Sequence, residues 1–304
     1  MRTAYLGTSE FAAKVLRRLA DSPHRPALVV TRSDSRRGRG RRLAPPPAAE
    51  AARALGLAIH QTADVNSPES LDAIRAARPE AVAVCAFGQL IKEPLLSEFP
   101  MFNVHPSLVP RWRGAAPIER TLMAGDQITG VTIMRVTEGL DSGPLALAEE
   151  IAVSPEDDYA SLSARLAEVG GELLVRALDA LSAGELAFTD QDDAQATYAE
   201  KVTGAERHLS PSRTAAELER IVRALTPHIG AFLELEDGER LGVRRAREVD
   251  DGPSSGTIEP RDGGLVVGSS GGGGLSLEVV QPPGKKPMNV ADFLRGHELP
   301  RRAV

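Results

Sequence analysis

Strand patterns and helical patterns alternate through the first two thirds of the chain, and this alternation restricts the possible folds more than any other feature. Apolar runs typical of strands occupy residues 4–7, 27–31, 58–61, 81–87, 101–105 and 130–136. Helical spacing of apolar residues occurs between or after them, at residues 11–20, 48–55, 68–77, 117–124 and 157–183. The inner strands are continuously apolar, as expected for strands that helices cover on both faces. We therefore predict an α/β fold with a doubly wound, mostly parallel, Rossmann-like sheet whose ligands lie at the carboxyl ends of its strands.

The last third of the chain has a different pattern. Periodicity is lost in a polar connecting segment from about residue 184, and a short helix is predicted at residues 215–225. Short strands separated by Gly and Asp turns follow at residues 231–235, 241–245, 256–258, 265–267 and 275–280. Such strands are typical of a small β-barrel. A chain of 304 residues accommodates two domains, and we place their boundary near residue 205, giving domains 1–205 and 206–304.

Composition restricts the compartment and the partners. The only cysteine, Cys85, lies in an apolar run, so no disulfide can form within the chain, which suits a reducing compartment. No signal peptide and no membrane span are expected, because no run of eighteen apolar residues occurs. We expect a cytoplasmic monomer. The net charge of -6 argues mildly against a nucleic-acid partner, but local patches decide such binding.

Two polar residues stand at the end of the fifth predicted strand. Asn103 and His105 are two positions apart and therefore project from the same face of an extended chain. Pro106 and Pro110 end the strand and stiffen the loop that follows. An amide and an imidazole thus share one space at a strand end, which indicates either an active site or a hydrogen-bonded capping network.

A basic stretch follows the second predicted strand, at residues 31–47. It contains six arginines and a single acidic residue, Asp34. Arginine planes pair with phosphates and stack on unpaired bases, and loops at the carboxyl ends of strands overlook the active site. The alternative is a solvated loop without a partner, as many charge runs are. The arginines that we assign to nucleic-acid binding are Arg36, Arg37, Arg39, Arg41 and Arg42.

Three other classes of site do not fit the sequence. The first strand is followed by Gly7-Thr8-Ser9-Glu10-Phe11, which lacks the three spaced glycines of a dinucleotide site. The same turn lacks the second glycine of a nucleophile elbow. The six histidines form no His-x-x-x-His pair, so we expect no metal.

Two longer segments resemble the N10-formyltetrahydrofolate-dependent formyltransferases. They are FNVHPSLVPRWRGAAPI at residues 102–118 and GVTIMRVTEGLDSGP at residues 130–144. The resemblance implies that Asn103, His105 and Asp141 are catalytic, although the sequence around Asp141 is also an ordinary turn. It implies 10-formyltetrahydrofolate as the formyl donor, with no metal. The residues that would border the folate are Ser107, Leu108, Val109, Pro110, Phe87, Gly88 and Leu90.

The resemblance is strongest to family members that formylate the amino group of initiator Met-tRNA. It implies that the basic stretch contacts the tRNA acceptor end, and that the second domain is an OB-like barrel contacting tRNA through Lys285 and Lys286. Residues 226–232 depart from the Trp-rich sequence usual in the family. One alternative is a formyltransferase acting on an amino sugar nucleotide or glycinamide ribonucleotide. Another is an RNA-binding protein without activity on the same fold.

Overall fold

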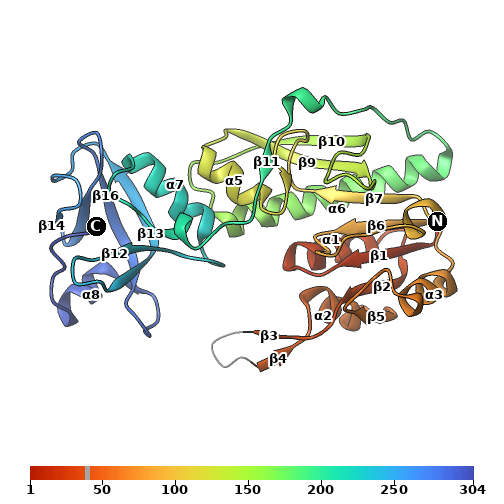
Figure 1. The fold of residues 1–304 in the computed structure, drawn as a ribbon, viewed down its shortest axis with the longest axis horizontal. Helices are drawn as coiled ribbons and strands as arrows, with labels where there is room; N and C mark the ends of the chain where they lie inside the picture. Colours follow the sequence, from red (N-terminus) through yellow and green to blue (C-terminus); the bar gives the residue numbers. More distant parts are fainter. Residues whose placement is uncertain (38–41) are drawn as a thin grey trace. The chain divides into compact units, whose positions relative to one another are not determined.

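The computed structural model describes residues 1–37 and 42–304, and of Arg37 it describes only the backbone. The chain divides into two compact units. The N-terminal unit comprises residues 1–117, 128–152 and 163–199, and the C-terminal unit comprises residues 118–127, 153–162 and 200–304. The ribbon of each unit is shown in Figure 1.

The N-terminal unit is organised around one sheet of seven strands among the described residues. Five neighbouring strands are parallel, and at one end of the sheet each of the last two strands runs antiparallel to the strand before it. The order across the sheet is β10 (Leu145–Ala152), β9 (Ile128–Arg135), β7 (Met101–His105), β6 (Ala81–Cys85), β1 (Thr3–Gly7), β2 (Pro26–Arg32) and β5 (Ile59–Thr62). The mostly parallel sheet confirms the fold class predicted from the alternation of patterns.

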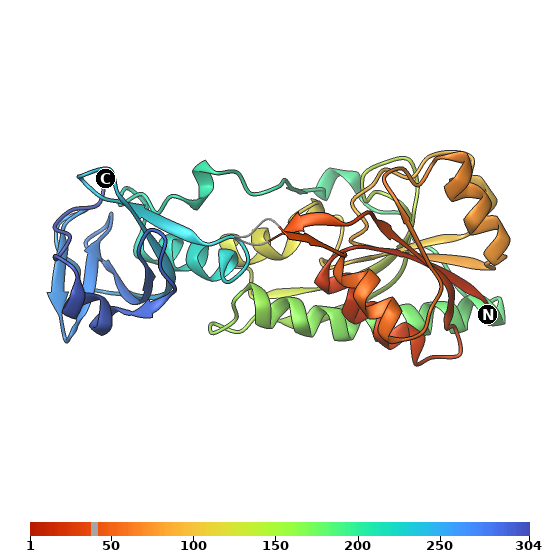
Figure 2. The same ribbon diagram turned by 90° about the horizontal axis from the view of Figure 1, so that it is seen from below.

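Helices cover both faces of this sheet, and Figure 2 shows α6 on one side and α3 on the other. On the α3 side, Leu71 and Ile74 pack with Ala4 and Leu6 of β1 in one apolar cluster. On the opposite side, Gly170 allows α6 to approach β7 closely, because a Cβ at this position would lie 2.9 Å from the side chain of Val104. The helices of this part of the chain are α1 (Glu10–Ala20), α2 (Pro47–Ala54), α3 (Pro68–Ala77), α4 (Leu95–Glu98) and α6 (Tyr159–Ala183). The helix α5 (Pro117–Ala124) belongs, from Ile118 on, to the C-terminal unit.

Local sequence explains where the helices begin. The side chain of Ser9 accepts a hydrogen bond from the backbone of Ala12 and caps α1, and Ser67 caps α3 in the same way ahead of Pro68. These caps follow directly after polar turns at strand ends. The helices therefore start at the edge of the sheet where ligands bind in doubly wound folds.

The basic stretch forms a short hairpin where a loop was expected. Its strands are β3 (Ser35–Arg37) and β4 (Arg42–Ala44), which pair antiparallel. Figure 1 shows the hairpin extending away from the sheet beyond α2. The side chain of Leu43 is 70% exposed on it, so the hairpin buries little apolar surface of its own.

The C-terminal unit contains an antiparallel sheet beside the helix α7 (Ala215–Leu225). The order across the sheet is β12 (Ala231–Glu234), β13 (Arg240–Val249), β16 (Gly274–Gln281), β15 (Gly264–Gly268) and β14 (Ile258–Arg261), with β17 (Met288–Asn289) on β16. A terminal helix, α8 (Val290–Gly296), was not predicted. After it, Leu235 next to β12 bridges Ala303, and Thr257 next to β14 bridges Arg302. The chain end therefore hydrogen-bonds to both edges of the sheet.

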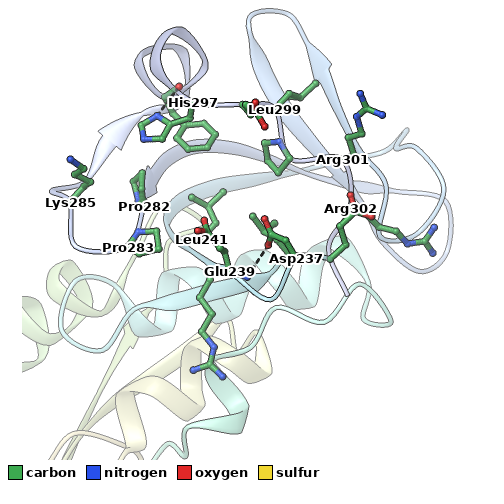
Figure 3. A pocket seen from close by; sticks show the side chains of 16 residues that line it. Asp237, Glu239, Leu241, Pro282, Pro283, Lys285, His297, Leu299, Arg301 and Arg302 are labelled. Atoms are coloured by element: carbon green, nitrogen blue, oxygen red, sulfur yellow. Dashed lines mark hydrogen bonds between the residues drawn. The ribbon is translucent and has the colours of Figure 1, made fainter.

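A pocket of about 790 Å³ opens in this unit between the β12–β13 turn, the Pro282–Lys285 turn and the chain end (Figure 3). Its walls include Pro282, Leu241 and Leu299. Its charged residues have both signs: Glu236, Asp237, Glu239 and Glu298 as well as Arg240, Lys285, Arg301 and Arg302. The pocket is therefore not a uniformly basic surface.

An ion pair joins two sequence-distant parts of the C-terminal unit. Arg120 of α5 donates to the carboxylate of Glu206, and the backbone and hydroxyl of Thr203 also donate to it. The guanidinium of Arg120, followed by Thr203, lowers the pKa of Glu206 from 4.5 to about 2. Because the folded pKa lies below the unfolded one, this group stabilises the fold above pH 4.5 and loses that effect as the pH falls toward 2.

We expect Glu206→Gln to lower the free energy of unfolding at pH 7 by about 1–2 kcal/mol. This is less than the full pKa shift would imply, because the carboxylate is partly exposed and solvent screens its charge. The deficit should shrink as the pH falls through the range between the two pKa values. Urea unfolding at several pH values measures it, with Glu259→Gln, an exposed carboxylate on β14, as the control. A deficit that stays constant with pH would contradict the ion-pair explanation.

Among residues 1–37 and 42–304, no helix is both long and apolar enough to cross a membrane.

Candidate active site

The pairing of β7 with β9 shows where the first two candidate residues lie. Asn103 lies opposite Met134 of β9, and His105 lies opposite Thr132, so both side chains leave the same face at the end of β7. The side chain of His105 is 4% exposed, and that of Asn103 is half-buried. The neighbouring residues Phe102 and Val104 are buried on the opposite face. The prediction that Asn103 and His105 project from the same face of the strand is confirmed.

Asp141 closes the group from a turn between β9 and β10. Its carboxylate accepts a hydrogen bond from Asn103 Nδ2 at 3.1 Å and one from the backbone N–H of Gly114 at 2.9 Å. Its Oδ2 atom lies 3.6 Å from His105 Nδ1, and its side chain is 16% exposed. The structure thus brings the three predicted residues into one cluster at the end of β7.

The second ring nitrogen of His105 is held by the loop that follows. Nε2 lies 2.8 Å from the backbone oxygen of Trp112. A carbonyl oxygen can only accept, so Nε2 carries a hydrogen and Nδ1 is the nitrogen that faces Asp141. At 3.6 Å the Nδ1 to Oδ2 contact is electrostatic and is too long for a hydrogen bond. The imidazole is therefore oriented with Nδ1 toward the Asp141 carboxylate.

Ser107 and its neighbours form the turn that supports this arrangement. The hydroxyl of Ser107 donates to the backbone oxygen of Arg111 at 2.7 Å, and its own carbonyl accepts from Thr132 Oγ1 at 2.8 Å. Ser107 and Val109 are buried, while Leu108 and Pro110 are half-buried. The side chains of Ser107 and Val109 are thus engaged within the protein.

The predicted folate loop follows the neighbouring strand, β6. Phe87 is 3% exposed and belongs to the core, while its backbone oxygen accepts from Thr8 Oγ1 at 2.8 Å. Gly88 has a φ of 77°, and Leu90 is 65% exposed. The loop therefore offers backbone groups and the Leu90 side chain at the surface, and keeps the Phe87 ring inside.

Four of the predicted tRNA residues have described side chains, and all four are exposed. Arg36 and Arg42 are exposed on the hairpin of β3 and β4, and Arg37 has a described backbone only. Arg39 and Arg41 lie outside the described residues. Lys285 and Lys286 are exposed in the C-terminal unit, at the turn after β16.

Two contributors to the cluster were missed in the sequence. The backbone N–H of Gly114 reaches Asp141, and Gly114 has a φ of 120° and packs so closely that a Cβ would lie 2.9 Å from the oxygen of Ala199. Gln191 donates to the backbone of the Asp141 turn. A backbone donor leaves no mark in the sequence, and Gln191 lies in a polar stretch without periodicity.

A metal site would need several clustered ligands. Among the described residues, no three His, Cys, Asp or Glu side chains are grouped so that they could hold a metal ion.

Comparison with known proteins identifies the family of this chain. The sequence profile described as "Formyl transferase" matches residues 1–178, and "Formyl transferase, C-terminal domain" matches residues 201–298. The chain therefore belongs to the formyl transferase family.

Relatives that match the whole chain carry a more specific name. The methionyl-tRNA formyltransferase of Methylococcus capsulatus is 41% identical over 303 residues, covering 98% of each chain. That of Halorhodospira halophila is 40% identical over 301 residues, covering 98% of this chain and 97% of the relative. Among solved structures, HypX from Aquifex aeolicus in complex with tetrahydrofolic acid has a TM-score of 0.69 at 15% identity. It covers 100% of this chain, which spans about half (51%) of HypX, and this likeness concerns the fold alone.

Proposed function

We propose that this chain transfers the formyl group of 10-formyltetrahydrofolate to the free amino group of initiator Met-tRNA, giving N-formylmethionyl-tRNA for translation initiation. The observation that carries the chemistry is the cluster of Asn103, His105 and Asp141 at the end of β7. The choice of acceptor is supported by relatives named methionyl-tRNA formyltransferase that match both units of the chain. A small-molecule formyltransferase would not need the arginine hairpin.

The catalytic roles follow from charge and position. Attack of an amine on the formyl carbon develops negative charge on the formyl oxygen and positive charge on the amine. We assign Asn103 and His105 to the oxygen, because an amide and an imidazole can both donate hydrogen bonds and the two side chains leave the same strand face. We assign Asp141 to orienting His105 and accepting the proton of the attacking amine, directly or through water. The bond between the formyl carbon and N10 of the folate then breaks, N10 takes up a proton, and tetrahydrofolate leaves. Positioned groups of this kind each supply roughly 10²- to 10⁴-fold in rate.

The folate donor supplies the formyl carbon, and the loops at the ends of β6 and β7 are proposed to border it. The contacts of Phe87, Gly88, Ser107 and Val109 would be made mainly by their backbones, since the Phe87, Ser107 and Val109 side chains are buried and Gly88 has none. Leu90 is 65% exposed and offers apolar surface. Leu108 and Pro110 complete the proposed border.

The second domain is proposed to hold tRNA. We retain a boundary near residue 205 between the catalytic domain and an OB-like barrel, and the support for a barrel is the chain end that hydrogen-bonds to both sheet edges. Lys285, Lys286 and the hairpin arginines are the proposed phosphate contacts. We place the reaction in the cytoplasm and propose that the enzyme acts as a monomer.

The test is formyl transfer from 10-formyltetrahydrofolate to purified initiator Met-tRNA. Deacylated tRNA, free methionine, glycinamide ribonucleotide and an amino sugar nucleotide serve as parallel acceptors. We expect product with Met-tRNA alone. Product with a small-molecule acceptor would contradict Met-tRNA as the acceptor but would agree with the proposed formyl-transfer chemistry. Binding of tRNA without turnover would indicate an RNA-binding protein without activity.

A further inference from the structure

The turn that carries Asp141 has a conformation that needs outside support. Asp141 has a φ of 47°, in the left-handed region where residues with a side chain are uncommon and mildly strained. Two residues on, Gly143 passes so close to β9 that a Cβ would lie 1.9 Å from the oxygen of Arg135. The carboxylate can face His105 only while this turn (residues 139–143, the Asp141 turn) keeps its shape.

Gln191 is hydrogen-bonded to this turn. Its Nε2 donates to the backbone oxygen of Asp141 at 2.9 Å and to that of Gly143 at 2.8 Å. Its Oε1 accepts from Arg113 Nε at 2.9 Å. Both amide hydrogens and the amide oxygen therefore have partners, and only an amide of this length provides two donors and one acceptor in this arrangement.

Arg113 links Gln191 to Gly114, the residue whose N–H binds the Asp141 carboxylate. It is 3% exposed, and its Nη2 donates to Asp193 at 2.7 Å. The next residue along the chain is Gly114, whose N–H donates to the carboxylate of Asp141. Gln191 thus joins the backbone of the Asp141 turn to the strand, β8 (Arg113–Gly114), that hydrogen-bonds the carboxylate.

We infer that Gln191 is a positioning residue for the formyl-transfer reaction, holding the Asp141 carboxylate in place beside Asn103 and His105. This inference rests on the proposed function. It gives a role in the active site to the polar stretch after α6, since residues 163–199 belong to the N-terminal unit.

We expect Gln191→Met to lower kcat for formyl transfer about 10- to 100-fold, because small displacements of a reacting group have effects of this size. KM for each substrate should stay within about threefold, since Gln191 does not touch the proposed substrate surfaces. The matched control is Gln195→Met, at an exposed position of the same segment where the amide contacts Asp192. It should retain wild-type kcat.

A double-mutant cycle separates positioning from general destabilisation. Once Asp141 is replaced, there is no carboxylate to position, so Gln191→Met should change kcat little in an Asp141→Asn background. A loss of the same size in both backgrounds, or wild-type kcat in Gln191→Met, would overturn the inference. If the wild-type chain did not formylate Met-tRNA, that result would count against the proposed function and not against this inference. The same double-mutant cycle would then be measured with the acceptor to which the chain does transfer a formyl group.

Discussion

Asp141→Asn should lower kcat for formyl transfer by about 10²- to 10⁴-fold while the fold stays intact. The carboxylate has two acceptor atoms, one for Asn103 and one for the N–H of Gly114. An asparagine has a single acceptor oxygen, so one of these hydrogen bonds is lost together with the negative charge beside His105. Asparagine tolerates the left-handed backbone well, which keeps the turn accessible to the variant.

Steady-state kinetics with Met-tRNA and circular dichroism of the same preparations measure these effects. Asp190→Asn, at an exposed position of the same unit, is the matched control and should retain wild-type kcat. His105→Ala should show a loss of similar order, since the imidazole and the carboxylate are proposed to act on the same reaction. Wild-type turnover in Asp141→Asn would refute the assignment of this cluster as catalytic.

The sheet could be predicted because burial on both faces leaves continuous apolar runs. β6, for example, is Ala-Val-Ala-Val-Cys and is buried throughout. The strand β10 could not be predicted in the same way. It is an edge strand whose first three residues are half-buried and whose remaining residues alternate between exposed and half-buried, and it contains the consecutive acidic residues Glu149 and Glu150. Its partner β9 was predicted as a strand, but its antiparallel pairing with β7 depends on the path of the chain between these two strands and not on its own sequence.

The candidate site was predictable only in part. The shared face of Asn103 and His105 follows from the two-residue period of a strand, whereas Asp141 was selected through the family resemblance. The support for Asp141 lies far away in the sequence, because Gly114 and Gln191 are 27 and 50 residues from it. Contacts between residues this far apart in the sequence arise from the tertiary fold, and no local sequence pattern predicts them.

The hairpin of β3 and β4 provides the second large expected effect. We expect Arg36→Gln with Arg42→Gln to raise KM for Met-tRNA on the order of 10- to 100-fold near 0.1 M salt, because each phosphate contact releases bound counterions from the nucleic acid. For the same reason, log KM against log salt should lose a slope of about 1–2. KM for 10-formyltetrahydrofolate should not change.

Arg17→Gln with Arg18→Gln removes the same charge from another exposed site, on α1 of the same unit. If only the net charge of the protein mattered, the two double variants would behave alike, because long-range attraction depends on total charge. If the hairpin binds phosphates directly, only its own variant lowers the salt slope. An unchanged slope in the hairpin variant would mean that these arginines are a solvated surface, and that tRNA is held elsewhere on the protein.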